Sequence, residues 1–235
     1  MVSAYDRKVL ALLLEEVHEH LEAGDLEQVE ELLREADAID ADDPDVRTLR
    51  AQLALDMDDL DEALEHALVA LRGADLADAH YVAARVYEAR EDAAARSRHD
   101  TEVLRLDAAE DLRHGTIARE DIDAIEAMAE AVLASLPPSV AEAVGKVPIV
   151  LEARPHQGIV EDGFDPRAVG LFEGDVAFGD AISDRPVRIV VFYVNLMAMC
   201  RDDAELEEQL RITLLHEIGH ALGLDEDEVD ALGLG

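Results

Sequence analysis

Apolar residues recur at three- and four-residue spacing through the first half of the chain. Between residues 9 and 110, Leu, Ala and Val follow this spacing, and strand-forming residues almost never stand in a row. Such spacing places apolar side chains on one face of a helix, so the sequence predicts one helix after another. A further helix is expected from Arg119 to Leu136, where Pro137 and Pro138 stop it.

The pattern changes after this proline pair. The segments 146–153 (KVPIVLEA) and 186–195 (PVRIVVFYVN) are rich in Val, Ile, Phe and Tyr, which favour strands. Residues 154–185 between them carry two prolines and five glycines, which favour short strands and turns. The expected fold class is therefore α+β, with an α-helical array first and a small α/β domain with a short sheet after it.

A final helix is expected after Cys200. Asp202 and Asp203 are candidates for its N-cap, and Glu205 is placed to close a capping box on Asp202. Apolar residues then repeat every four positions and are expected to pack this helix onto the sheet. They are Leu206, Leu210, Leu214 and Ile218.

The helical half contains a repeating unit. Gly24-Asp25-Leu26 aligns with Asp58-Asp59-Leu60 at an offset of 34 residues, and Glu91-Asp92 follows about 33 residues further along. These spacings resemble tetratricopeptide repeats, in which each unit is a hairpin of two helices. An irregular helical bundle with a coincidental period is the alternative.

The resemblance to tetratricopeptide repeats covers three degenerate hairpins. The small residues that let the helices approach would be Ala36, Ala63 and Ala70, whereas Arg96 stands where a small residue is usual. The resemblance implies a concave face that takes a peptide or a protein partner. Weak candidates for contacts on this face are Arg47, Arg50, Arg85 and Tyr81, for which solvated charge and helix packing are the favoured explanation.

A glycine marks the end of the helical array. Gly115 follows Arg113 and His114 and breaks the helical run before a fresh helix starts. We therefore expect two domains, a helical repeat domain over residues 1–114 and a second domain over residues 115–235.

Residues suited to catalysis concentrate in the last predicted helix, where His216, Glu217 and His220 stand in the segment HEIGH. Two histidines four residues apart lie one helical turn apart, so both imidazoles can reach one zinc ion. The glutamate between them points to the open side of the ion, where it can deprotonate a bound water molecule.

The residues that follow HEIGH extend this hypothesis. Gly223 comes three residues after His220, where the helix must end and the chain must turn sharply to bring back a third ligand. Glu226 stands ten residues after His216, where the metzincin pattern places its third ligand.

Residues of about 119–235 resemble the small zincin-like metallopeptidase family. The resemblance rests on LPPSVAEAV at 136–144, the VPIVLE strand, a GLFEG turn at 170–174, RIVVFYVN at 188–195 and TLLHEIGHALGLDEDE. It implies His216 and His220 as zinc ligands, Glu217 as general base, and a third ligand from the acidic cluster. There Glu226 is favoured and Asp225 is the reserve, while solvated charge is the simpler explanation of Asp227, Glu228 and Asp230.

The function implied by this resemblance is a zinc-dependent metallopeptidase. It would hydrolyse peptide bonds through a zinc-bound water with Glu217 as general base, and the helical repeats would recruit a substrate or partner. The strand of residues 187–194 or its neighbour is expected to pair with an extended peptide, and Tyr193 is either a packing residue, which is favoured, or an aid to the oxyanion. The alternative function is a non-catalytic, metal-stabilised scaffold for protein–protein interaction.

Charge and composition exclude other partners. The chain carries 56 acidic and 20 basic residues, a formal net charge of −36, which repels nucleic acids and anionic membranes. Its most apolar run, Ile189 to Met199, is too short to cross a bilayer. The single cysteine, Cys200, excludes an internal disulfide, and the N-terminus lacks the apolar core of a signal peptide. We expect a cytoplasmic protein.

The acidity also predicts a halophilic protein. Lys8 and Lys146 are the only lysines, and carboxylates are spread along the whole chain. Dense carboxylate surfaces stay soluble where molar salt screens their mutual repulsion. The alternative is a merely acidic protein with an interaction surface.

Halophily can be tested by folding at two salt concentrations. We expect cooperative folding in molar KCl and a loss of helicity in dilute buffer, because repulsion between the carboxylates is unscreened there. Far-UV circular dichroism measures the helicity in both conditions, and identical spectra would contradict the prediction.

Overall fold

The computed structural model describes residues 2–115, 117–144, 147–174 and 187–225. It divides into two compact units, which we describe separately: residues 1–114 with 157–163, and residues 115–156 with 164–235. Within the described residues, no helix combines the length and the apolar character that crossing a lipid bilayer requires.

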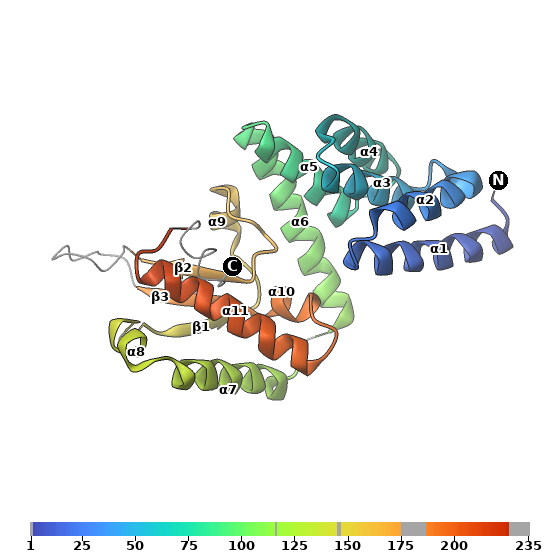
Figure 1. The fold of residues 1–235 in the computed structure, drawn as a ribbon. Coiled ribbons are helices and arrows are strands. Elements are labelled where there is room, and N and C mark those ends of the chain that lie inside the picture. The colour runs from blue at the N-terminus through green and yellow to red at the C-terminus, as the bar shows by residue number, and fades with distance from the viewer. Residues whose placement is uncertain (1, 116, 145–146, 175–186, 226–235) are drawn as a thin grey trace. The chain divides into compact units, whose positions relative to one another are not determined.

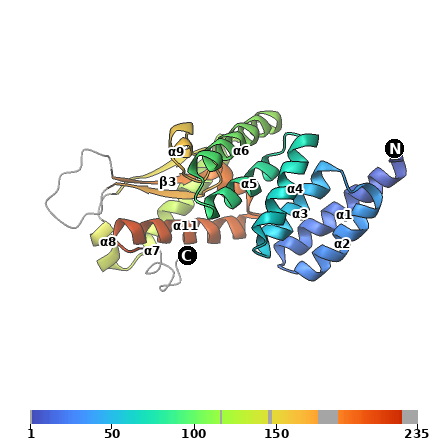
Figure 2. The same ribbon diagram turned by 90° about the horizontal axis from the view of Figure 1, so that it is seen from above.

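The first unit consists mainly of long helices joined by short turns (Figures 1 and 2). Its described helices up to residue 114 are α1 (Ala4–Glu22), α2 (Leu26–Asp40), α3 (Pro44–Asp56), α4 (Leu60–Gly73), α5 (Ala77–Ala89) and α6 (Ala93–His114). Neighbours pack as hairpins, α1 with α2, α3 with α4 and α5 with α6. The helical first half expected from the apolar spacing is therefore present.

The three hairpins share one turn geometry. Gly24, Asp58 and Glu91 have positive φ angles of 72°, 61° and 58°, a conformation that is strained for residues with a Cβ atom. The aspartate after each of them accepts a hydrogen bond from the backbone N–H three residues later, in the pairs Asp25–Gln28, Asp59–Glu62 and Asp92–Ala95. The sequence offsets of 34 and 33 residues thus correspond to a recurring turn and helix cap.

Small residues and ion pairs hold these helices together. Ala36, Ala63 and Ala70 are buried, as expected where helices approach closely. The arginines considered above have partners inside the unit: Arg47–Asp42 at 3.5 Å, Arg50–Asp37 at 2.5 Å and Arg85–Asp100 at 2.8 Å. The Arg85 guanidinium also lies 4.9 Å from the centre of the Tyr81 ring. These contacts favour helix packing as the role of these residues.

A short segment from later in the chain groups with this unit. Helix α9 (Gln157–Glu161) packs against α6, where the Ser97 hydroxyl donates a 3.0 Å hydrogen bond to the Glu161 carbonyl. The Arg96 guanidinium donates to the Gly163 carbonyl and pairs with Asp100 at 3.2 Å. Arg96 stands where the repeat pattern usually has a small residue, and its side chain contacts Gly163 and Asp100. The expected boundary at residues 114 and 115 did not anticipate that 157–163 returns to the helical unit.

The second unit combines helices with a small sheet. Its elements are α7 (Arg119–Ser135), α8 (Pro138–Val144), β1 (Ile149–Glu152), β2 (Gly170–Glu173), β3 (Arg188–Phe192), α10 (Tyr193–Ala198) and α11 (Asp203–Ala221). The described strands lie in the order β1-β3-β2, with β1 parallel and β2 antiparallel to β3. A mostly helical chain with a small three-stranded sheet agrees with the expected α+β class.

Two expected elements differ from the structure. The segment GLFEG at 170–174 was expected as a turn, but Gly170–Glu173 forms strand β2 because it pairs with β3. The strand expected to continue to residue 195 ends at Phe192, and α10 begins at Tyr193. The change to helix buries the Leu196 side chain in the core and the Asn195 side chain among backbone carbonyls, so tertiary contacts override the strand preference of Phe, Tyr and Val.

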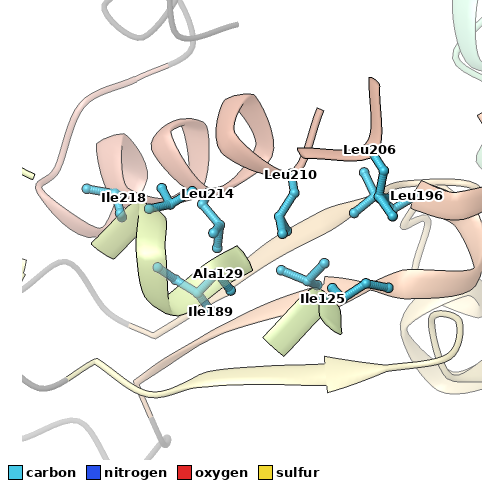
Figure 3. Packing of buried hydrophobic residues seen from close by; sticks show 10 residues of the cluster. Ile125, Ala129, Ile189, Leu196, Leu206, Leu210, Leu214 and Ile218 are labelled. Carbon is cyan, nitrogen blue, oxygen red and sulfur yellow. The ribbon is translucent and has the colours of Figure 1, made fainter. Parts of the chain in front are cut away.

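Helix α11 carries the expected apolar stripe into the core of this unit. Figure 3 shows Leu206, Leu210, Leu214 and Ile218 directed toward buried side chains of α7 and β3. Each of the four is at most 9% exposed, and burying a leucine or isoleucine contributes about 1.5–3 kcal/mol. This packing fixes which way the remaining faces of α11 point.

The start of α11 departs from the expected capping box. Asp202 is the N-cap, and its carboxylate accepts from the N–H groups of Ala204 and Glu205 at 3.0 and 2.9 Å. The Glu205 carboxylate accepts from the Arg201 N–H at 2.8 Å and not from Asp202. The Arg201 guanidinium also contacts Glu205, and this charge pairing draws the carboxylate one residue further back.

Candidate metal centre

The C-terminal end of α11 shapes the candidate metal centre. The helix ends at Ala221, and Gly223 follows with a φ of 87°, which favours glycine. The Gly223 N–H donates to the His220 carbonyl at 2.9 Å and the Leu224 N–H to the Gly219 carbonyl at 3.1 Å, the bond pattern of a Schellman cap. The sharp turn expected at Gly223 is therefore observed.

His216 and His220 lie side by side on the last turns of α11. Their Nε2 atoms are 3.0 Å apart, and their rings meet nearly edge to face, with an interplanar angle of 80°. The Nδ1 atom of His220 lies 3.2 Å from the Leu224 carbonyl. A proton on Nδ1 donated to this carbonyl leaves a lone pair on Nε2, which is the tautomer that a metal ligand needs.

Glu217 lies in a buried position next to this histidine pair. Its side chain is on α11, and the residue is only 8% exposed. Strand β2 approaches it at Gly170, where a Cβ atom would lie 2.8 Å from Glu217 Oε1 and 2.7 Å from Thr213 Cγ2. A larger residue would overlap with Thr213 and Glu217 unless their side chains shifted, so glycine lets the backbone of β2 lie against the carboxylate.

The donor set fits a zinc ion. Two nitrogens bound at about 2.0–2.1 Å to one tetrahedral ion lie roughly 3.3 Å apart, close to the 3.0 Å between the two Nε2 atoms. Within the described residues, no group of three or more His, Cys, Asp or Glu side chains suited to a metal is found. Among the described residues the structure therefore brings together two nitrogen donors, and Glu217 lies between them in the sequence of the same helix.

The expected third ligand, Glu226, lies outside the described residues, as do Asp227, Glu228 and Asp230. The reserve candidate, Asp225, is the last residue described before this gap, and it is exposed. The choice between Glu226 and Asp225 stays a prediction.

Three further side chains lie in or beside the core of the second unit. Tyr193, Phe172 and Cys200 are partly buried and pack against its buried cluster, which favours packing roles for all three. Burial, followed by the nearby Glu205 and Asp202 carboxylates, raises the pKa of the Cys200 thiol. A raised pKa disfavours the thiolate form that binds metals.

Two residues with structural roles in the second unit were not singled out from the sequence. Gly170 is one of the five glycines of residues 154–185, and a glycine in a strand often marks the close approach of another segment. Asn195 is the polar residue within the apolar run 189–199, and it is 6% exposed and bonded to surrounding backbone. Its signal in the sequence was that it is the single asparagine of the chain.

Comparison with known proteins supports the class suggested by this geometry. Residues 144–235 match the family model described as Zincin-like metallopeptidase. The match covers less than half of the chain but includes β1, β2, β3 and the whole of α11. It makes the C-terminal part similar to a family of metal-dependent peptidases. No curated protein matches the chain.

A double-mutant cycle tests the close contact between Gly170 and the side chains of α11. We expect Gly170→Ala to lower the free energy of unfolding by about 1–3 kcal/mol, because the new methyl group overlaps with Thr213 and Glu217. Thr213→Ser removes one of the overlapping atoms and keeps the hydroxyl that donates to the Gln209 carbonyl, so it should recover part of this loss. Denaturant unfolding of the four proteins in molar KCl measures the coupling, and an equal loss in both backgrounds would contradict the contact.

Proposed function

We propose that this protein is a zinc-dependent metallopeptidase in which His216, His220 and Glu226 hold the metal and Glu217 is the general base. The observation that carries the proposal is the pair of imidazoles with Nε2 atoms 3.0 Å apart, beside a buried glutamate. The match of residues 144–235 to zincin-like metallopeptidases supports the same reaction class.

The chemistry divides between the metal and the protein side chains. Zinc held by these residues would supply Lewis-acid chemistry, which polarises a carbonyl and makes water more acidic. Glu217 takes the proton of the attacking water on its carboxylate and passes it to the leaving amine. Its 8% exposure limits competing contacts with bulk water, and the Gly170 backbone restricts the positions that the carboxylate can take.

Strand β2 is the segment that we place along an extended substrate. The strand of residues 187–194 or its neighbour was expected in this role, but β3 already pairs with β1 on one side and β2 on the other. Among the described strands, β1 and β2 lie at the two edges of the sheet, and β2 packs against α11, which carries the histidine pair. The outer backbone groups of β2 can pair with a peptide, as exposed strand edges do in other proteins.

The helical unit is proposed as a tetratricopeptide-like module that recruits a substrate or a protein partner. The recurring turns at Gly24, Asp58 and Glu91 support the repeat assignment, because equivalent positions adopt the same unusual backbone conformation. Cytoplasmic location and halophily belong to the same proposal and rest on the composition and charge of the chain.

A conservative change at Glu217 tests the reaction. We expect Glu217→Gln to keep its zinc and to lose turnover of a fluorescence-quenched peptide library by about 10²–10⁴-fold, because the amide cannot accept the water proton. Glu207→Gln, on an exposed position of the same helix, is the matched control and should keep full activity.

The outcome also separates the two candidate functions. Turnover by the wild type that is lost only in Glu217→Gln supports the peptidase. A wild type that binds zinc but cleaves no peptide, with Glu217→Gln unchanged in stability and partner binding, would favour the non-catalytic, metal-stabilised scaffold.

A further inference from the structure

Asn195 makes three hydrogen bonds, two of them to the segment that leads into β2 and one to Arg154. Its Nδ2 atom donates to the carbonyls of Pro166 and Ala168 at 3.0 and 2.7 Å. Its Oδ1 atom accepts from the Arg154 guanidinium. The residue is 6% exposed, so these bonds replace water around nearly all of the amide.

These bonds fix the chain that leads into β2. The N–H of Phe192, at the end of β3, donates to the Val169 carbonyl at 2.9 Å, next to the carbonyls bound by Asn195. Three carbonyls between residues 166 and 169 are therefore held by the junction of β3 and α10. The following residue, Gly170, is the one whose backbone lies against Glu217.

An amide side chain suits this position, whereas an ionised carboxylate does not. Two carbonyl oxygens face Nδ2 and need two N–H donors, which an amide supplies and an ionised carboxylate does not. Buried carbonyls that lose their hydrogen-bond donors are destabilising, because no water replaces the lost bond. An aspartate here would place a carboxylate, which only accepts hydrogen bonds, against two carbonyl acceptors. The chain has 56 acidic residues, and its single asparagine is at this position.

We propose that Asn195 is a positioning residue for the hydrolysis reaction, an inference that rests on the proposed peptidase function. It holds residues 166–169 in place, so that the Gly170 backbone keeps the Glu217 carboxylate in the position where it meets the attacking water. Without these bonds the Gly170 backbone beside Glu217 moves away, and the carboxylate spends less time in its productive position. Displacements of about 1 Å can cost about 100-fold in rate.

The test compares Asn195→Asp and Asn195→Leu with the wild type. Both variants are similar in size to asparagine, but neither can donate two hydrogen bonds at neutral pH. Gln52→Glu is the matched control, because it also replaces an amide by a carboxylate, on α3 of the helical unit. Zinc content, helicity, peptide turnover and amide hydrogen exchange of residues 164–173 are measured in molar KCl.

We expect both Asn195 variants to keep zinc and helicity. Their kcat should fall about 10- to 100-fold with KM within about twofold, and exchange of residues 164–173 should be at least about tenfold faster. Exchange of α6 should be unchanged, and Gln52→Glu should match the wild type throughout. Should Asn195→Leu fail to fold, Asn195→Asp decides the question because it is nearly isosteric with asparagine.

Two results would overturn the proposal: unchanged exchange of residues 164–173 in Asn195→Asp, or faster exchange with an unchanged kcat. A wild type without turnover would refute the proposed function alone. Hydrogen exchange would then still test whether Asn195 fixes residues 166–169. Faster exchange in the variants supports this role, and unchanged exchange refutes it.

Discussion

Burial of one face of α11 is the constraint on which the second unit depends. Leu206, Leu210, Leu214 and Ile218 fill the space against α7 and β3, and turning the helix about its axis would expose all four side chains to water. At about 1.5–3 kcal/mol for each, such a rotation is out of reach for a domain of ordinary stability. The direction in which His216, Glu217 and His220 point is therefore set by residues that take no part in the chemistry.

Two backbone segments outside α11 contact the side chains of the candidate site. Gly223 ends α11 with a cap that brings the Leu224 carbonyl to His220 Nδ1, and Gly170 lets β2 approach Glu217. One glycine is needed for its positive φ angle and the other for its missing side chain. The histidine pair and the glutamate are thus each held by a contact from outside their own helical turn.

The sequence predicted the parts of this structure that depend on local pattern. Helical spacing predicted the first half of the chain, the leucine stripe predicted the buried face of α11, and HEIGH predicted that His216 and His220 would lie together. Tertiary contacts decided the rest. Residues 193–195 have strand-forming neighbours, yet a helix begins at Tyr193. The helix buries the side chains of Asn195 and Leu196. No periodicity reveals that Gly170 meets Glu217 or that residues 157–163 pack on α6, because both contacts join segments distant in sequence.

The central claim is that His216 and His220 bind one zinc ion. Metal analysis of protein purified in molar KCl tests it most directly, for the wild type, His216→Ala and the control His80→Ala in the helical unit. We expect about one zinc per chain in the wild type and the control, and almost none in His216→Ala. A wild type without zinc after zinc is supplied, or full zinc content in His216→Ala, would contradict it.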